Sequence, residues 1–365
     1  MRIPPDIFIA GLHTALAPTV ATTTALEEGK VLRRVAETVG AHQLPAATEP
    51  GAPRLAIEAA EAAMDGARIQ AEEIDILVHA WIHHQGHDFW SPAHHIAHEV
   101  GAVNALPVGV QTMCNGGETA IEIAVARLIC DPDATTAVVT TADIFAGGFD
   151  RWNSDSFLWY GDAGTALVLT TEPRPGHPKL LACAATTVLD GEGLHRGSDP
   201  YTWAPRQHGD VVDVRRTKKA HLQSASGDAF NTSMRDALRH VIHTAVHDAG
   251  LSLSLSLDSP RLRYLALPRV GRKVIRDLYV PAVEDLTNAE IVYLGDHSGH
   301  LGAGDTPANL TDLIAQENHA PDDIGLFVCA GGGFTVSCLA VELGTPGITN
   351  VRSTADTRAW VGVAS

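Results

Sequence analysis

The sequence predicts an α/β protein in which one structural plan is used twice. Short, continuous apolar runs alternate with amphipathic helical patterns along the 365 residues, which is typical of strands that helices cover on both faces. The alternation stops at the turn-rich segment 171–176 and then begins again. In each cycle a glycine turn leads into a closing strand. We therefore predict two similar halves, residues 1–172 and 173–365.

In the first half, strands and helices follow from the spacing of apolar residues. Helices are predicted over 53–66 and 117–128, where Ala, Ile and Leu recur at helical spacing. A glycine turn at 161–164 leads into the last strand of this half. The predicted strands are residues 74–82, 106–113, 136–142 and 165–170.

The second half begins its cycle with a long helix over 227–250, in which Phe230, Met234, Leu238 and Ile242 recur at every fourth position. Strands are predicted at 264–267, 291–294 and 325–330, and the glycine turn 331–333 leads into the closing strand.

Residues 190–225 do not fit the alternation. They contain His195, Tyr201, Trp203 and the basic cluster Arg215, Arg216, Lys218 and Lys219. Because long irregular stretches inside compact domains are commonly functional, we predict a lid or binding loop here.

Composition excludes several classes of protein. The formal net charge of −17 argues against a partner with a phosphate backbone, so no nucleic acid is expected. No apolar run reaches the roughly 18 residues of a membrane helix, and Asp6 and His13 interrupt the N-terminal apolar run that a signal peptide needs. The five cysteines are an odd number without a CxxC pair, which indicates a reducing compartment. We expect a soluble, cytoplasmic protein.

Cys114 is the first candidate for chemistry. It follows the strand that ends near Met113 and precedes Asn115-Gly116-Gly117 and a helix. At a helix N-terminus, unpaired N–H groups and the helix dipole stabilise a thiolate, which is the nucleophilic form. The two glycines allow close approach of another segment or a substrate. The alternative is a small buried residue at a turn, the ordinary role of a free cysteine.

A nucleophilic cysteine needs a base, and the base needs an orienting group. His300 and Asp305 lie five residues apart in a glycine-rich turn that follows a strand and precedes a helix, so the carboxylate can fix the imidazole tautomer. His297 is a possible second base. Alternatively, Asp305 caps the helix ahead of Pro307 and the histidines are ordinary loop residues.

A second group of histidines carries no metal-binding signature. His94 and His98 lie four apart on a predicted helix, but their flanks supply no third ligand. We predict no metal site. The group consists of His79, His83, His84, His87, His94, His95 and His98.

Taken in order along the chain, four motifs resemble those of β-ketoacyl-acyl carrier protein synthase III. They cover nearly the whole chain and consist of Cys114 at its strand-helix turn, Tyr160-Gly161-Asp162-Ala163-Gly164, Ser226-Gly227-Asp228-Ala229-Phe230, and Gly331-Gly332-Gly333-Phe334-Thr335. The resemblance implies a thiolase fold, a duplicated αβαβα five-layered sandwich, and a homodimer. It also implies an acyl group carried on Cys114 and an oxyanion hole made by the N–H groups of Cys114 and Gly332.

The sequence departs from this family at two motifs. Where condensing enzymes have a histidine in Pro-His-Gln-Ala-Asn, this chain reads Pro268-Arg269-Val270, and where they have Gly-Asn-Thr-Ser it reads Gly295-Asp296-His297-Ser298. The lost histidine and asparagine stabilise the enolate left by decarboxylation. The chain resembles instead the ester-forming subgroup, the CerJ-type malonyl transferases.

This resemblance implies an acyltransferase without a cofactor. Cys114 takes an acyl group, of malonyl type, from an acyl carrier protein or coenzyme A thioester. His300, oriented by Asp305, deprotonates a hydroxyl of a natural product, such as a sugar or polyketide, and an ester forms without decarboxylation. The alternatives are a decarboxylating condensing enzyme and a non-catalytic homologue that assists a carrier protein.

Carrier proteins are acidic, so docking to this acidic chain needs a local basic patch. We favour Arg269, Arg272, Lys273 and Arg276 for this patch over the cluster at 215–219. The alternative is that both clusters are ordinary solvated surfaces.

Overall fold

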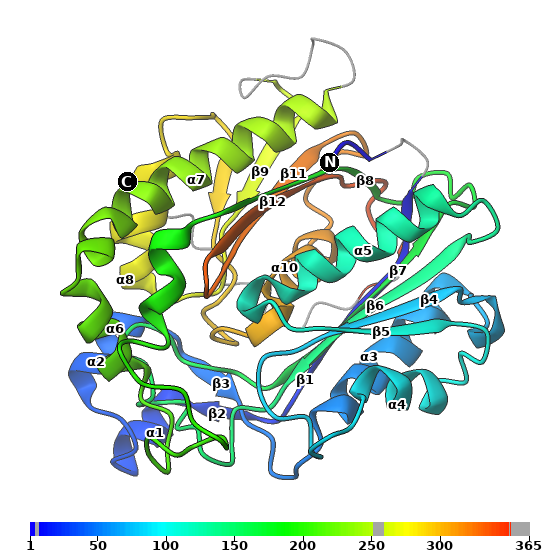
Figure 1. The fold of residues 1–365 in the computed structure, drawn as a ribbon. Helices are drawn as coiled ribbons and strands as arrows, with labels where there is room; N and C mark the ends of the chain where they lie inside the picture. Colours follow the sequence, from blue (N-terminus) through cyan, green and yellow to red (C-terminus); the bar gives the residue numbers. More distant parts are fainter. Residues whose placement is uncertain (4–6, 251–258, 350, 352–365) are drawn as a thin grey trace.

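The sheet of this protein repeats one strand order on either side of its centre. The computed structural model describes residues 1–3, 7–250, 259–349 and 351. Within them, ten strands form one mixed sheet in the order β10-β9-β11-β12-β8-β1-β7-β6-β4-β5 (Figure 1). The ten strands are β1 (Phe8–Leu16), β4 (Ile76–Ala80), β5 (Leu106–Val110), β6 (Thr136–Asp143), β7 (Ala163–Thr170), β8 (Lys179–Thr187), β9 (Leu262–Ala266), β10 (Glu290–Val292), β11 (Ile324–Gly331) and β12 (Thr335–Glu342).

The strand directions repeat as well. In the first half β1 and β6 run antiparallel to β7, and β4 runs parallel to both β6 and β5. In the second half β8 and β11 run antiparallel to β12, and β9 runs parallel to both β11 and β10. The halves join through β1 and β8, where Phe8 is paired with Lys179. The predicted duplication of the plan is confirmed; the division into domains at residue 172 stays a prediction.

Helices add three further layers to the two five-stranded halves (Figure 1). The helices are α1 (Thr22–Glu27), α2 (Arg33–Val39), α3 (Ala52–Ala67), α4 (Pro92–Glu99), α5 (Gly116–Cys130), α6 (Val214–Leu222), α7 (Ala225–Ala249), α8 (Arg272–Val274), α9 (Val280–Val283) and α10 (Asp305–Ala315). A π-helical turn, Ile275–Tyr279, links α8 to α9. A separate two-stranded sheet, β2 (Thr19–Ala21) with β3 (Gln43–Pro45), lies beside α1.

The core explains the layering. Strand residues alternate between two faces, so Val139 and Phe327 pack on α5 and α10 in the central layer, while Val138 packs on α3 and Leu326 on α7. The central core holds the buried apolar side chains of both central helices, among them Ile121 of α5. The predicted αβαβα sandwich is therefore present.

Two expectations need correction. The strand predicted to reach Met113 ends at Val110, because Met113 has a positive φ of 53° and belongs to the 3₁₀ turn η2 (Met113–Asn115). The segment 190–225 is only partly irregular, since it contains the 3₁₀ turn η3 (Leu189–Leu194) and α6. Its basic cluster lies on α6 rather than on a loop.

Candidate active site

The candidate site lies where two equivalent loops of the repeat meet. One follows β5, contains η2 with Cys114, and leads into α5; we call it the cysteine loop, residues 111–115. The other follows β10, contains His300 and the 3₁₀ turn η5 (Gly302–Gly304), and leads into α10; we call it the histidine loop, residues 293–304. Each loop therefore ends at the N-terminus of a central helix.

Glycine at the start of α5 lets the two loops touch. A Cβ on Gly117 would lie 2.5 Å from the Ala303 carbonyl oxygen and 3.2 Å from the ring of Pro307. Any larger side chain would push α5 away from the histidine loop. This is the close approach that the Gly116-Gly117 pair predicted.

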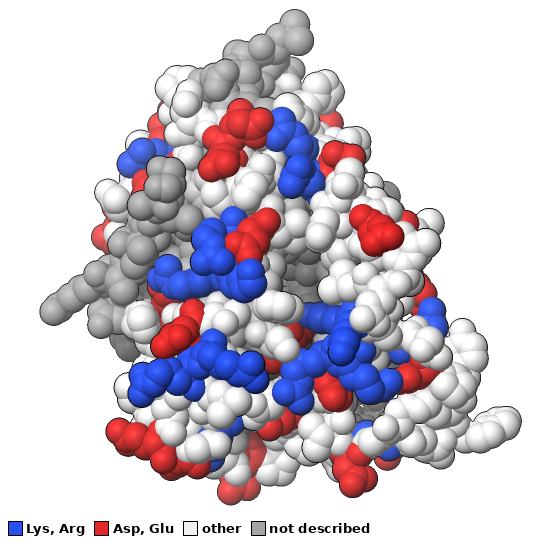
Figure 2. Space-filling model, turned by 90° about the vertical axis from the view of Figure 1, so that its left-hand side faces the viewer, with Lys and Arg blue, Asp and Glu red and all other residues white. Residues whose placement is uncertain are grey.

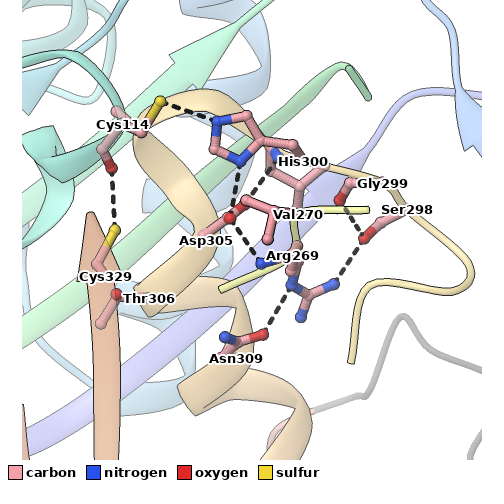
Figure 3. Close-up of polar contacts among 12 residues, drawn as sticks. Cys114, Arg269, Val270, Ser298, Gly299, His300, Asp305, Thr306, Asn309 and Cys329 are labelled. Atoms are coloured by element: carbon pink, nitrogen blue, oxygen red, sulfur yellow. Dashed lines mark hydrogen bonds and ion pairs between the residues drawn. The ribbon is translucent and has the colours of Figure 1, made fainter. Parts of the chain in front are cut away.

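Cys114, His300 and Asp305 form a continuous line of contacts (Figure 3). The Nε2 atom of His300 lies 3.0 Å from the Sγ atom of Cys114, and its Nδ1 lies 2.8 Å from Oδ2 of Asp305. The side chains of His300 and Asp305 are each 1% exposed, whereas Cys114 is partly exposed. The structure thus brings together the three residues predicted as nucleophile, base and orienting group.

The carboxylate of Asp305 is held by the backbone. Oδ1 accepts a hydrogen bond of 2.8 Å from the N–H of Leu301, and Oδ2 accepts one of 2.8 Å from the N–H of Arg269. Asp305 also occupies the first turn of α10, where the helix dipole favours negative charge. Asp305 therefore has the predicted orienting contact with His300, whereas the predicted capping role is wrong, because Gly304 is the N-cap residue of α10 and no side chain caps this helix end.

The charges of this pair are coupled. Burial by itself would lower the pKa of His300, but the Asp305 carboxylate and Cys114 raise it well above 6.5. Burial would likewise raise the pKa of Asp305, but His300 and the backbone donor at Leu301 lower it. The imidazole is thus set to hold a proton beside the Asp305 carboxylate.

Cys114 and His300 open into a mainly apolar cavity of about 380 Å³. Gly332 also lines it, at the hairpin between β11 and β12. A Cβ on the neighbouring Gly331 would lie 2.5 Å from the N atom of Asn115, so glycine is needed for the hairpin to sit against the cysteine loop. Gly332 thereby faces the same cavity as Cys114; their oxyanion role stays a prediction.

Arg269 was predicted to contact a carrier protein, and this is wrong. Its side chain is 1% exposed, and its guanidinium is an internal brace (Figure 3). It donates to Asn309 Oδ1 at 2.9 Å, to Ser298 Oγ at 2.8 Å and to Asp312 Oδ2 at 2.6 Å. Arg269 therefore ties the histidine loop to α10.

The other three residues of the predicted patch reach the surface, with ion pairs of their own. Arg272 pairs with the buried Asp296, while Lys273 and Arg276 both contact Asp277. Lys273 and Asp277 line the cavity beside Cys114. Of the predicted patch, Lys273 therefore reaches the cavity, while Arg272 and Arg276 do not line it.

His297, the predicted second base, does not line the cavity among the described residues. Its ring lies 5.5 Å from that of His42, centroid to centroid. The structure therefore separates it from the line of contacts through His300.

Sequence reasoning missed a second polar group in the cavity wall. The Nζ of Lys218 donates to the buried Asp155, whose Oδ2 also accepts from the Tyr160 hydroxyl at 3.5 Å. The Tyr160 ring stands edge-on to His300, at 5.4 Å between centroids, and His195 lines the same cavity. The only sequence signal was the irregularity of residues 190–225, which carry His195 and Lys218.

All five cysteines are free thiols. Within the described ranges, no group of three or more His, Cys, Asp or Glu side chains is arranged to hold a metal ion. No helix in the described part of the chain has both the length and the apolar character to cross a membrane.

Comparisons with known proteins agree with this architecture. Residues 108–187 match the family model of 3-oxoacyl-[acyl-carrier-protein] synthase III. The chain is 26% identical to the β-ketoacyl-[acyl-carrier-protein] synthase III of Rhodospirillum centenum over 77% of this chain and 80% of that protein.

Two solved structures extend the comparison to the whole fold. A structure of ChlB3, described as an acyltransferase, is 28% identical with a TM-score of 0.84, over 94% of this chain and 100% of that one. The 3-oxoacyl-[acyl-carrier-protein] synthase III of Aquifex aeolicus VF5 has the same fold, with a TM-score of 0.70 at 18% identity over 92% and 99%.

A duplicated sandwich with a cysteine at the start of a central helix defines an acyl-transferring enzyme of the thiolase superfamily. The chain is similar in sequence and in fold to the β-ketoacyl-acyl carrier protein synthase III-like enzymes of that superfamily.

Proposed function

We propose that this enzyme transfers an acyl group of malonyl type from a thioester to a hydroxyl of a natural product, without decarboxylation. The observation that carries the proposal is the line Cys114-His300-Asp305, which joins a nucleophile to a base and its orienting carboxylate. The similarity to ChlB3, described as an acyltransferase, supports it.

The surroundings of Arg269 argue against condensation. It stands where the condensing relatives carry a histidine, and its guanidinium is engaged by Asn309, Ser298 and Asp312. It also does not line the cavity among the described residues, so it is not placed to donate to an enolate there. The base that remains beside Cys114 is His300.

Acyl loading requires a thiolate and a proton donor. The thiolate of Cys114 attacks the donor carbonyl, the carbon-sulfur bond of the donor breaks, and the leaving thiolate takes the proton of the His300 imidazolium. The products are an acylated Cys114, a neutral His300 and the free donor thiol.

Transfer reverses the proton movement. Neutral His300 takes the proton of the acceptor hydroxyl as its oxygen attacks the acyl carbon, and the Cys114 thiolate leaves. The ester departs, and the imidazolium-thiolate pair is restored. No cofactor takes part beyond the donor thioester, and Asp305 stabilises the imidazolium in both steps.

The donor is carried by a phosphopantetheine arm, on an acyl carrier protein or in coenzyme A. Figure 2 shows several groups of Lys and Arg side chains on the face that holds α2, α6 and α8. Arg272 and Lys273 belong to α8, Arg276 belongs to the π-helical turn that follows it, and Lys273 also lines the cavity. A local basic patch of this kind suits an acidic carrier protein despite the net charge of −17.

The enzyme acts as a homodimer in the cytoplasm. Reducing conditions, such as those of the cytosol, protect a nucleophilic thiol at Cys114 from oxidation. β5 ends the sheet and exposes Leu106, so this edge offers pairing positions to a second copy. The acceptor is a small molecule such as a glycosylated polyketide.

Intact-protein mass spectrometry after incubation with malonyl thioesters, without acceptor, tests the proposal. We expect a retained malonyl adduct that maps to Cys114 and disappears in Cys114→Ala. An acetyl adduct with release of carbon dioxide would favour the condensing reaction. No adduct would favour a non-catalytic homologue.

A further inference from the structure

Lys218 is one of a few charged side chains in the mainly apolar wall of the active-site cavity, together with Arg235, Lys273 and Asp277. Lys218 of α6 and His195, which follows η3, line the cavity that contains Cys114. Most of their neighbours in the wall are apolar, among them Leu194, Leu222 and Phe334. A charged side chain in such a wall is costly unless a partner compensates it.

Asp155 compensates the charge of Lys218 but does not use all of its donors. The Lys218 side chain is 14% exposed and the Asp155 side chain 0%. Oδ1 of Asp155 accepts from the N–H of Phe157 at 2.9 Å, and Oδ2 accepts from Lys218 and Tyr160. An ammonium has three N–H groups, and Asp155 is the only acceptor for Lys218 among the described residues.

His195 lines the same cavity as the nucleophile, and its ring nitrogens are available. The ring stacks on Phe334, with centroids 6.0 Å apart, and a Cβ on Gly332 would lie 2.3 Å from Nδ1. Neither ring nitrogen makes a hydrogen bond to the part of the chain that the structure describes. Burial and the charge of Lys218 lower the pKa of His195 to about 4, so the ring is neutral and carries one N–H donor.

We propose that Lys218 and His195 bind the free carboxylate of the acyl group on Cys114 and so select diacid-derived donors. This inference rests on the proposed acyl transfer. A carboxylate accepts hydrogen bonds from both side chains, whereas a plain alkyl chain leaves the donors without a partner.

The same contact explains retention of the carboxylate. Decarboxylation moves negative charge from the carboxylate to the thioester oxygen. A cation fixed at the carboxylate stabilises the starting state more than the transition state and so slows the loss of carbon dioxide.

The test compares malonyl and acetyl loading of Cys114 from N-acetylcysteamine thioesters, followed by intact-protein mass spectrometry. In Lys218→Met we expect the ratio of malonyl to acetyl loading rates to fall by about tenfold or more, the size of one charge-assisted hydrogen bond. Lys219→Met is the matched control, since Lys219 is the exposed next residue of α6 and does not line this cavity. Its ratio should match that of the wild type.

Removing Lys218 leaves the Asp155 carboxylate buried without its cation, which could destabilise the fold. A second variant therefore separates loss of stability from loss of the binding group. Asp155→Asn/Lys218→Met removes both charges and should show the same fall in the ratio. An unchanged ratio in this double variant, with a malonyl adduct retained by the wild type, overturns the inference and leaves acyl transfer standing. A wild type that retains no malonyl adduct instead overturns the proposed function, and the inference with it.

Discussion

The cysteine loop and the histidine loop occupy equivalent places in the two halves and are built in opposite ways. The cysteine loop is short and leads into a helix that starts with Gly116-Gly117. The histidine loop is longer and leads into a helix that starts with Asp305-Thr306-Pro307. The glycines at the start of α5 leave space beside the helix, and Pro307 in the first turn of α10 occupies part of that space. The two halves share a strand order, but the candidate active site forms only where the cysteine loop of one half meets the histidine loop of the other.

The two helix starts also share one electrostatic task. α5 presents its N-terminus next to the Cys114 thiol, and α10 presents its own to the Asp305 carboxylate. Each helix dipole favours a negative group at its N-terminus. His300 lies between the side chains of Cys114 and Asp305 and contacts both. Duplication thus supplied two anion-stabilising positions that share one imidazole.

The largest expected effects come from substitutions that distinguish the role of the cysteine loop in acyl loading from the role of the histidine loop in acyl transfer. Cys114→Ala removes the acyl acceptor, so it should abolish both loading and transfer. His300→Ala should still load the acyl group, more slowly, while transfer to the hydroxyl falls by about 10²- to 10⁴-fold, the usual contribution of a general base. Single-turnover kinetics on pre-acylated enzyme measures the transfer step.

Cys130→Ala, which changes an exposed thiol, is the control and should match the wild type in both steps. Transfer at the wild-type rate in His300→Ala would show that another group is the base.

The second prediction loosens only the histidine loop. Arg269→Met removes the guanidinium from the buried Asp312, which should lower the free energy of unfolding by about 3–5 kcal/mol. Arg269→Met/Asp312→Asn should recover part of this loss, since it also removes the buried carboxylate. Urea unfolding followed by circular dichroism measures both; a loss below about 1 kcal/mol in the single variant would contradict the bracing role.

The third prediction breaks the contact between the loops. Gly117→Ala places a Cβ 2.5 Å from the Ala303 carbonyl oxygen, so we expect a loss of about 1–3 kcal/mol in unfolding free energy from overpacking. Acyl transfer should slow as well, because Cys114 moves away from His300.

Gly66→Ala is the matched control, a glycine inside α3 whose Cβ would meet nothing closer than 3.8 Å. Because alanine favours the helix, it should stabilise the protein by up to about 1 kcal/mol. Equal effects of the two substitutions would rule out a special fit at Gly117.

The smallest effect concerns pH. The pKa of His300 is raised in the folded state above its ordinary 6.5, so its protonated form stabilises the fold. This contribution is complete below about pH 6.5 and declines as pH rises through the folded pKa. The difference in unfolding free energy between wild type and His300→Gln should therefore shrink from pH 6 toward pH 9. A difference that grows with pH would mean that His300 is neutral in the free enzyme.

Much of the fold follows from sequence because its signals are local. The apolar residues of α7 recur at helical spacing, and the runs at β6 and β7 are continuous, so periodicity located each of these elements to within a few residues. The placement of Cys114 before α5, of His300 before α10 and of Asp305 at the start of α10 follows from the same reasoning. The order of the four motifs along the chain then predicted that the two halves form one thiolase fold.

The errors concern contacts between distant segments. Arg269 looks like part of a basic surface run with Arg272 and Lys273, and only the packing of α10 against the histidine loop shows that it is buried. Lys218 and Asp155 lie 63 positions apart in the sequence, and no local pattern predicts that they pair. Charge alone does not reveal exposure, since a cation can be buried where acceptors from distant segments surround it.

The distance along the chain between Cys114 and His300, 186 positions, has a consequence for folding. Contacts of such sequence separation form late, after the local helices and strand pairs, because closing a long loop costs chain entropy. The thiol therefore meets its imidazole only when the two halves have docked. Acyl transfer is then a sensitive reporter of the final step of folding, and intermediates with near-native secondary structure should be inactive in it.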